Sequence, residues 1–185
     1  MSLVPYLYSA FEEYQKTGLP PVSAVVMEYP QDEAARNLDD EYFFGKDLLV
    51  CPLTLEDGTS REVYLPEGNW YNFFTGEKIE GGRRLVLEAD WNEMLVFARD
   101  GALVPVAEPV ICVTEDTVFN ITVKSFGTNK TGSCVLYEDD FVSFNYESLV
   151  AKKQINVTVG DNGKFIVSGA KTSTKYHFLN CIVKD

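Results

Sequence analysis

The chain has 185 residues, of which 45% are hydrophobic and 24% are charged, a composition typical of folded globular proteins. Sixteen basic against 28 acidic residues give a net charge of −12, which would repel a phosphate backbone, so nucleic acid is not an expected partner. No apolar run approaches the roughly 20 residues of a membrane-spanning helix. We therefore expect a soluble polypeptide without a membrane partner, and nothing in the sequence indicates its compartment.

The N-terminal residues carry the pattern of an amphipathic helix, with apolar side chains recurring at spacings of three and four. Pro5 suits the first turn, and Gly18 followed by two prolines ends the helix. The apolar positions are Leu3, Leu7, Ala10, Phe11 and Tyr14. Residues 22–27 and 48–53 then predict short buried strands. A complete (β/α)8 barrel needs about 250 residues and eight helices, so one helix excludes it.

From about residue 59, short apolar runs alternate with turn residues, which is typical of antiparallel β-sandwiches. Strands are expected at 61–65, 70–74 and 94–99, and the composition changes near residue 108. Beyond it, 119–124 alternates strictly, and 155–159 with 165–167 predicts a hairpin. The predicted fold class is mainly β, with two consecutive antiparallel β-sandwich domains preceded by one helix and one strand.

The four cysteines are isolated from one another, and His177 is the single histidine, so a zinc site of nitrogen and sulfur ligands is not expected. Each cysteine lies in an apolar, strand-like run. We expect buried free thiols, with two disulfides as the alternative. The cysteines are Cys51, Cys112, Cys134 and Cys181.

Acidic clusters are the main candidates for chemistry, because glycoside hydrolysis uses two carboxylates across the scissile bond. The clusters are Glu12-Glu13, Asp39-Asp40-Glu41 and Glu138-Asp139-Asp140. Neighbouring side chains diverge on extended backbone, so none of them makes a catalytic pair by itself. The third cluster is either a plain acidic turn or a site for a hard cation. No nucleophile elbow accompanies His177 and no phosphate-binding loop is present, so we assign no catalytic, cofactor-binding or metal residue.

Trp70 and Tyr71 are the candidate contact residues for carbohydrate, because aromatic rings exposed on a sheet face can stack on sugars. The competing interpretation places them in a sandwich core. Asn120, Asn129 and Asn156 begin Asn-x-Ser/Thr triplets, which would accept glycans only in a eukaryotic secretory pathway.

Several segments, in the same order along the chain, resemble the C-terminal portion of glycoside hydrolase family 31, the α-glucosidase and α-xylosidase family. They are VPYLY (4–8), MEYPQD (27–32), FFGKDLLVCP (43–52), VYLPEGNWYNFFTGE (63–77), VFARDGALVP (96–105) and LYEDD (136–140). The chain departs from the family pattern at Ser23-Ala24, where many members have Arg-Pro, and at Phe141, where Gly is usual.

The resemblance implies three regions: the end of a catalytic barrel (1–45) that contributes the helix and the first strand, a proximal β-sandwich (46–108) and a distal β-domain (109–185). It implies a parent enzyme that hydrolyses α-linked glucosides or xylosides through a covalent intermediate without a metal or organic cofactor. The family's catalytic aspartates lie upstream of every matched segment. We therefore expect this chain to be inactive alone, to have the parent's barrel as partner, and to self-associate through its exposed helix.

Two other functions fit the residues. One is a freestanding carbohydrate-binding β-sandwich that uses Trp70 or Tyr71. The other is a purely structural domain that pairs with another protein through its strand edges.

Overall fold

The structure is a computed structural model. It describes residues 1–54, 59–90, 92–127, 133–139, 155–159, 164–168 and 173–184. Helix α1 (Val4–Thr17) has Pro5 in its first turn and ends at Gly18, whose φ of 76° is left-handed. The amide of Gly18 donates to the carbonyl oxygen of Tyr14 at 2.8 Å. The predicted helix and its glycine cap are therefore confirmed.

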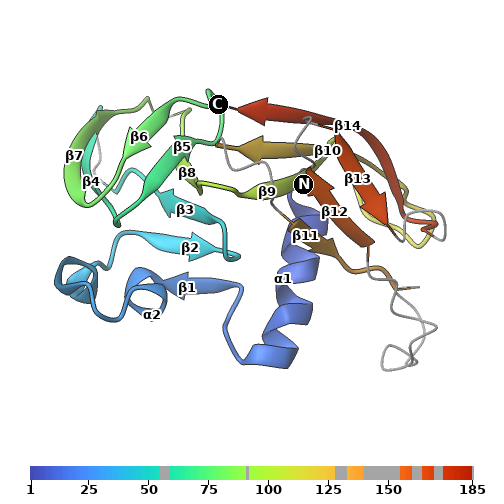
Figure 1. Ribbon diagram of the computed structural model, residues 1–185, viewed down its shortest axis with the longest axis horizontal. Helices are drawn as coiled ribbons and strands as arrows, with labels where there is room; N and C mark the ends of the chain where they lie inside the picture. Colours follow the sequence, from blue (N-terminus) through green and yellow to red (C-terminus); the bar gives the residue numbers. More distant parts are fainter. Residues whose placement is uncertain are drawn as a thin grey trace.

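A six-stranded antiparallel sheet forms the centre of the first sandwich, in the order β1-β2-β3-β8-β5-β6 (Figure 1). Its strands are β1 (Val22–Ala24), β2 (Tyr42–Phe44), β3 (Leu48–Cys51), β8 (Leu95–Arg99), β5 (Asn69–Asn72) and β6 (Lys78–Glu80). The antiparallel pair β4 (Ser60–Leu65) and β7 (Arg83–Glu88) packs on one face of this sheet. Between β1 and β2 lie the short helix α2 (Val25–Glu28) and the 3-10 helix η1 (Glu33–Asn37).

This sheet is buried on both faces, which explains its continuous apolar runs. Leu49 and Phe97 point toward β4 and β7, where they share a core with Val63. Their neighbours Leu48 and Val96 point the other way, into a second core. That second core also contains side chains of α1 and of the following sandwich, so it joins all three parts of the molecule.

The second sandwich pairs two three-stranded sheets. One has the order β14-β10-β9 and consists of β14 (Tyr176–Lys184), β10 (Phe119–Phe126) and β9 (Leu103–Ala107). The other has the order β11-β12-β13 and consists of β11 (Ser133–Leu136), β12 (Ile155–Val159) and β13 (Phe165–Ser168). The predicted alternation at 119–124 and the predicted hairpin are confirmed as β10 and as the β12–β13 pair. One pairing differs from the expected antiparallel pattern, because β10 and β14 run parallel.

Hydrogen bonding runs across both predicted domain boundaries. Strands β1 and β2 belong to the same sheet as β3, so the boundary between residues 45 and 46 lies inside one sheet. Strand β9 pairs with β10 across residue 108. Strand β1 is an antiparallel edge strand of this sheet.

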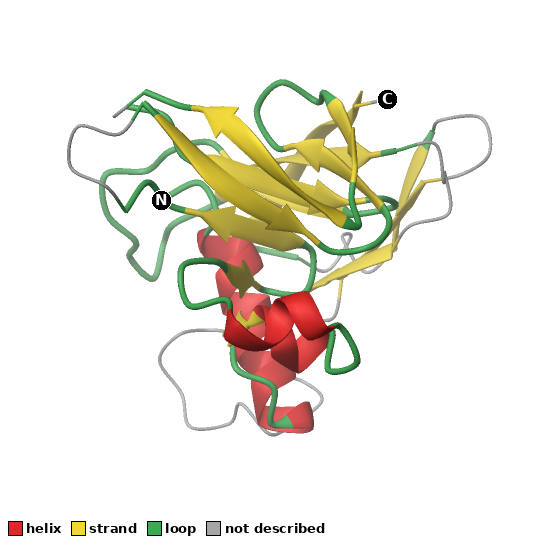
Figure 2. Ribbon diagram, turned by 90° about the vertical axis from the view of Figure 1, so that its left-hand side faces the viewer, coloured by secondary structure: helices red, strands yellow, loops and turns green. Residues whose placement is uncertain are grey.

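The run at residues 22–27 forms a strand only as far as Ala24 and then turns into α2. A six-residue apolar run shows too few repeats to separate a strand from a helical turn. Figure 2 shows the helices gathered on one side of the strands. Among the described residues, no helix combines the length and the apolar character needed to cross a bilayer.

Candidate functional site

Helix α1 is fastened to the first sandwich through Tyr6. The hydroxyl of Tyr6 donates to the carbonyl oxygen of Phe44 at 3.1 Å and accepts the backbone N–H of Asp47, also at 3.1 Å. Its ring lies directly against Gly45, in the turn between β2 and β3. Burial raises the pKa of Tyr6, so its hydroxyl keeps the proton that it donates.

The same helix is fastened to the second sandwich one turn later. The hydroxyl oxygen of Ser9 accepts the backbone N–H of Tyr137 at 3.1 Å, and Tyr8 donates to the carboxylate of Asp139. The ammonium group of Lys16 lies 4.4 Å from the centre of the Tyr137 ring. Residues 6–16 of one helix therefore contact both sandwiches through specific polar groups.

Glu138 is a buried carboxylate whose two oxygens both accept hydrogen bonds. One of its oxygens accepts Ser173 Oγ at 2.5 Å, and the other accepts the backbone N–H and the hydroxyl of Thr174, both at 2.9 Å. The neighbouring Asp139 binds Tyr8, and Asp140 lies outside the described residues. Within the described part of the chain, no three metal-ligating side chains cluster.

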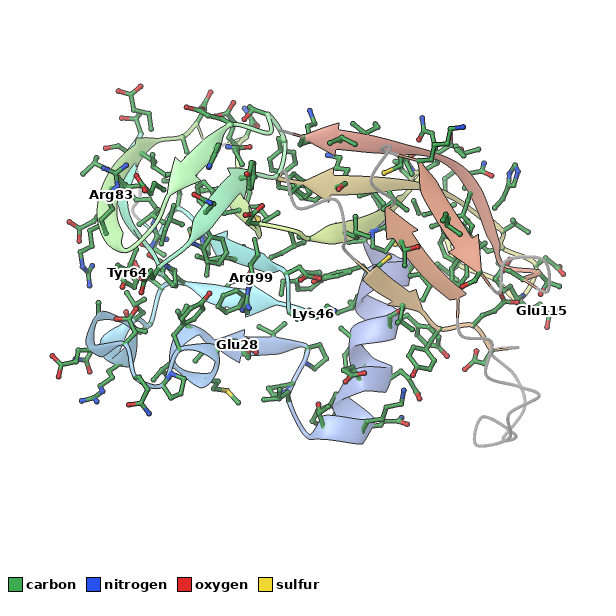
Figure 3. All side chains as sticks on the ribbon, in the orientation of Figure 1. Glu28, Lys46, Tyr64, Arg83, Arg99 and Glu115 are labelled. Atoms are coloured by element: carbon green, nitrogen blue, oxygen red, sulfur yellow. The ribbon has the colours of Figure 1, made fainter. Side chains whose placement is uncertain are left out.

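Arg99, at the end of β8, ties the segment after β1 to the sheet (Figure 3). Its guanidinium lies 3.0 Å from the carboxylate of Glu28 and is stacked 4.5 Å from the ring centre of Phe43. Its backbone N–H donates to the carbonyl oxygen of Asp47 at 3.0 Å. The Nε atom of Arg99 is buried and has no hydrogen-bond partner within the described residues.

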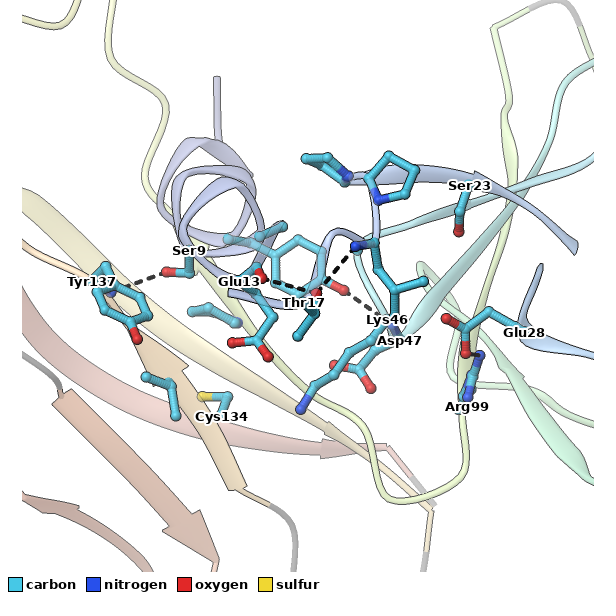
Figure 4. A pocket seen from close by; sticks show the side chains of 18 residues that line it. Ser9, Glu13, Thr17, Ser23, Glu28, Lys46, Asp47, Arg99, Cys134 and Tyr137 are labelled. Atoms are coloured by element: carbon cyan, nitrogen blue, oxygen red, sulfur yellow. Dashed lines mark hydrogen bonds and ion pairs between the residues drawn. The ribbon is translucent and has the colours of Figure 1, made fainter. Parts of the chain in front are cut away.

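A cavity of about 480 Å³ opens between α1, the β2–β3 turn and β11 (Figure 4). Side chains of Glu13, Lys46 and Asp47 enter it, and Pro20 and Pro21 form part of its apolar wall. Burial raises the pKa of the Asp47 carboxyl, and the nearby Lys46 and Arg99 partly oppose that effect.

The structure places Trp70 and Tyr71 in two cores, and each is 1% exposed. The two side chains point to opposite faces of the sheet. Both faces are covered, so neither ring is available to stack on a sugar. Trp70 Nε1 donates instead to the carbonyl oxygen of Pro66 at 2.8 Å. The condition for carbohydrate contact, which was exposure on a sheet face, is not met here.

The expectation of four buried thiols is wrong for Cys112, which is exposed, and Cys181 is only half-buried. The apolar run around Cys112 lies in a loop between β9 and β10 rather than in a strand. His177 does lie in a strand, β14, where its Nδ1 is 3.2 Å from Asn120 Oδ1.

The triplet at Asn120 begins inside β10, and its amide also donates to Glu108 at 2.8 Å. Asn129 lies outside the described residues, and of Asn156 only the backbone, in β12, is described. The polar anchors Tyr6, Tyr8 and Ser9 were missed in the sequence. Their partners lie between 38 and 131 positions away in the chain, so no local pattern marks them.

The described part of the chain thus consists of two β-sandwiches with one helix hydrogen-bonded to both. Residues 18–104 match the model of the glycosyl hydrolase family 31 C-terminal domain. The chain belongs to this family and corresponds to the C-terminal part of its enzymes.

Relatives and solved structures agree with this assignment. Alpha-glucosidase 2 of Bacillus thermoamyloliquefaciens is 34% identical over 89% of this chain and 21% of its own length. The alpha-xylosidase of Saccharolobus solfataricus is 33% identical over 78% of this chain and 20% of its own length.

Among solved structures, the family 31 dextranase of Flavobacterium johnsoniae matches with a TM-score of 0.78 and 32% identity over 90% of this chain and 21% of its own. The family 31 alpha-xylosidase of Xanthomonas citri matches all of this chain with 20% of its own, at a TM-score of 0.77 and 28% identity. The chain thus spans about a fifth of the length of these proteins.

Proposed function

We propose that the chain is the non-catalytic C-terminal part of a retaining α-glycosidase, and that it holds a late helix of the catalytic barrel against two β-sandwiches. The observation that carries this proposal is the double attachment of α1, through Tyr6 to the first sandwich and through Ser9 to the second. The names of the relatives support α-linked glucosides or xylosides as substrates of the whole enzyme.

The remaining surface of α1 and of the segment after it supports the barrel as partner. Large apolar side chains there stay in water, each between 46% and 51% exposed: Phe11, Tyr14, Leu19, Val22 and Met27. Strand β1 is an edge strand of its sheet, so within the described part of the chain one of its edges has no partner strand. These five residues form an apolar margin next to the edge of β1. An exposed apolar surface beside a strand edge favours burial against another domain or protein.

Activity of the purified chain tests the non-catalytic role. We expect no hydrolysis of an aryl α-glucoside or aryl α-xyloside above a matched blank, because a single helix cannot place two carboxylates about a scissile bond. Turnover above the blank would overturn the proposal.

The size of the native polypeptide tests the parentage. An antibody raised against this chain should detect, in an extract of its source, a band several times larger than 20.8 kDa. A band at the chain's own size would instead favour a freestanding protein.

Sedimentation of the isolated chain tests the apolar margin. We expect self-association that weakens when Phe11 and Tyr14 are both changed to Gln. The matched control is Val86→Gln, because Val86 is 72% exposed on β7 and is outside the margin. Equal sedimentation of all three proteins would contradict a role for the margin.

A further inference from the structure

The segment that joins α2 to β2 lies on the first sandwich as a strap, which we define as residues 29–41. Its backbone makes local hydrogen bonds, from the N–H of Asp32 to the carbonyl oxygen of Tyr29 at 3.1 Å and from the N–H of Ala35 to that of Asp32 at 3.2 Å. Within the described residues, no backbone group between positions 29 and 40 pairs with the backbone of a strand. Ala35 is fully buried, and Leu38 packs against the same core. The strap therefore depends on side chains for its attachment.

Two residues of β4 hold the strap. The hydroxyl of Tyr64 donates to Oδ2 of Asp32 at 2.6 Å, and the backbone N–H of Tyr64 donates to Oε1 of Glu41 at 2.7 Å. Arg61 donates to the carbonyl oxygen of Asp40 at 3.2 Å and to its carboxylate at 2.7 Å. The same guanidinium lies 3.5 Å from the carboxylate of Glu41. Three carboxylates of the strap are thus bonded to β4.

The attachment at Arg61 contains two carboxylates and one guanidinium. The side chains of Arg61 and Glu41 are 5% and 1% exposed, whereas that of Asp40 is 40% exposed. Arg61 forms a close ion pair with Asp40 and only a long contact with Glu41. Oε2 of Glu41 is buried and has no hydrogen-bond partner within the described residues. A buried carboxylate without a matching positive charge is costly, so the cluster favours a state that retains one proton.

The groups on the neighbouring strands do not remove this imbalance. Arg84 on β7 favours the ionised form of Glu41, but its guanidinium is paired with Glu62 at 2.9 Å. Cys51 on β3 also lies near Glu41, and burial raises the pKa of its thiol, so it adds no positive charge. Burial raises the pKa of Glu41 to about 7, and the charge of Asp40 adds to this rise. A detached strap would return Glu41 to water, where the ordinary pKa is about 4.3.

We propose that the strap is a pH-operated latch: it is held on β4 while the cluster of Asp40, Glu41 and Arg61 retains one proton, and it opens locally more readily once Glu41 is ionised. The attached strap binds this proton more tightly than the open strap does. Opening therefore becomes more favourable as the pH rises from about 4.3 to about 7, and it changes little above that. The latch uses residues of this chain alone and does not depend on the proposed role beside a barrel.

Hydrogen exchange of the ¹⁵N-labelled chain, followed by NMR between pH 5 and pH 8, measures the opening. The reporters are the hydrogen-bonded amides of Ala35 and Tyr64, and their rates are divided by the intrinsic rates to give protection factors. Their protection should fall on the order of fiftyfold across this range, mostly below pH 7. It should also stay below that of the β10 amides, which report unfolding of the whole chain. Equal protection of the reporters and β10, or no fall with pH, would overturn the latch.

Substitutions separate a latch from a purely structural contact. Glu41→Gln keeps an acceptor for Tyr64 and cannot ionise, so the protection of the reporters should no longer depend on pH. Asp40→Asn removes the neighbouring negative charge, so the fall in protection should end at a lower pH than in the unaltered chain. The matched control is Glu33→Gln, at an exposed glutamate of the same strap, which should keep the unaltered profile. Circular dichroism verifies that each variant is folded. Folded Glu41→Gln or Asp40→Asn chains with the profile of the control would reject the latch.

Discussion

The hydroxyl of Tyr6 donates a hydrogen bond of 3.1 Å to the carbonyl oxygen of Phe44, which lies 38 positions later in the chain. Phe44 ends β2, and Tyr6 lies in the first half of α1, so this contact joins the helix to the central sheet. The hydroxyl also accepts the N–H of Asp47, and one oxygen atom thus satisfies two backbone groups of the same turn. The helix and the turn are therefore expected to unfold together.

Tyr6→Phe should lower the free energy of unfolding by about 1–3 kcal/mol, because it leaves a part-buried carbonyl oxygen and N–H without their partner. Urea denaturation followed by circular dichroism measures the effect. Tyr14→Phe is the matched control, since Tyr14 lies on the same helix and is 46% exposed. Equal midpoints for the two variants would contradict the anchoring role of the Tyr6 hydroxyl.

Gly45→Ala should destabilise the chain by about 2 kcal/mol or more, for two separate reasons. Gly45 has a φ of 62°, where a side chain is strained, and an added Cβ would lie 2.5 Å from Cζ of Tyr6. Thermal unfolding measures the loss.

A double-mutant cycle separates these two causes. In a Tyr6→Leu background the ring is absent, so Gly45→Ala should cost less than in the unaltered chain. Gly18→Ala is the comparison for strain alone, because Gly18 has a φ of 76° and no neighbour within 4 Å of an added Cβ. A cost at Gly45 that is independent of Tyr6 would refute the steric contact.

Local sequence patterns were enough to predict the elements that depend on near neighbours. Helix α1 followed from apolar spacing and from Gly18, and β10 followed from strict alternation at 119–124. The β12–β13 hairpin also joins neighbouring segments. In each case the information is local: the spacing or alternation within the element itself, a cap that follows it directly, or a turn between neighbouring strands.

Contacts between distant segments could not be predicted in the same way. The parallel pairing of β10 with β14 joins Phe119 to Tyr176, and nothing near either residue specifies the other. Trp70 and Tyr71 are both buried because their sheet is covered on two faces. One of these faces packs against residues of the second sandwich, which lie far away in the sequence. The cavity beside α1 was missed for the same reason, because Glu13 and Asp47 border the same space only in the folded chain.

Thiol reactivity should follow burial. We expect Cys112 to react first with iodoacetamide, because it is exposed, and Cys181 to react more slowly. Cys51 and Cys134 should be protected until the chain unfolds, since both are buried, and burial raises the pKa of Cys134 to about 12. Mass spectrometry of tryptic peptides after timed labelling gives the order. Early labelling of Cys51 or Cys134 in the folded chain would contradict this packing.

The free energy of unfolding should change with pH because Glu41 is buried, with 4% of the residue exposed. Its Oε1 accepts the N–H of Tyr64 at 2.7 Å and lies 3.5 Å from the Arg61 guanidinium, while Oε2 is buried without a partner in the described chain. Burial raises the pKa of Glu41 to about 7, against the opposing effects of the Tyr64 hydrogen bond and of Arg61. The folded state thus binds this proton more tightly than the unfolded state.

The folded pKa lies above the unfolded value of about 4.3, so the contribution of Glu41 to stability is greatest below that value and is lost as the pH rises to about 7. The loss should be on the order of 3 kcal/mol. Glu41→Gln keeps an acceptor for Tyr64 and cannot ionise, so its free energy of unfolding should vary less between pH 5 and pH 8. Urea denaturation across that range measures the difference, with the exposed Glu77→Gln as control. Parallel pH profiles for the unaltered chain and Glu41→Gln would show that Glu41 titrates normally in the fold.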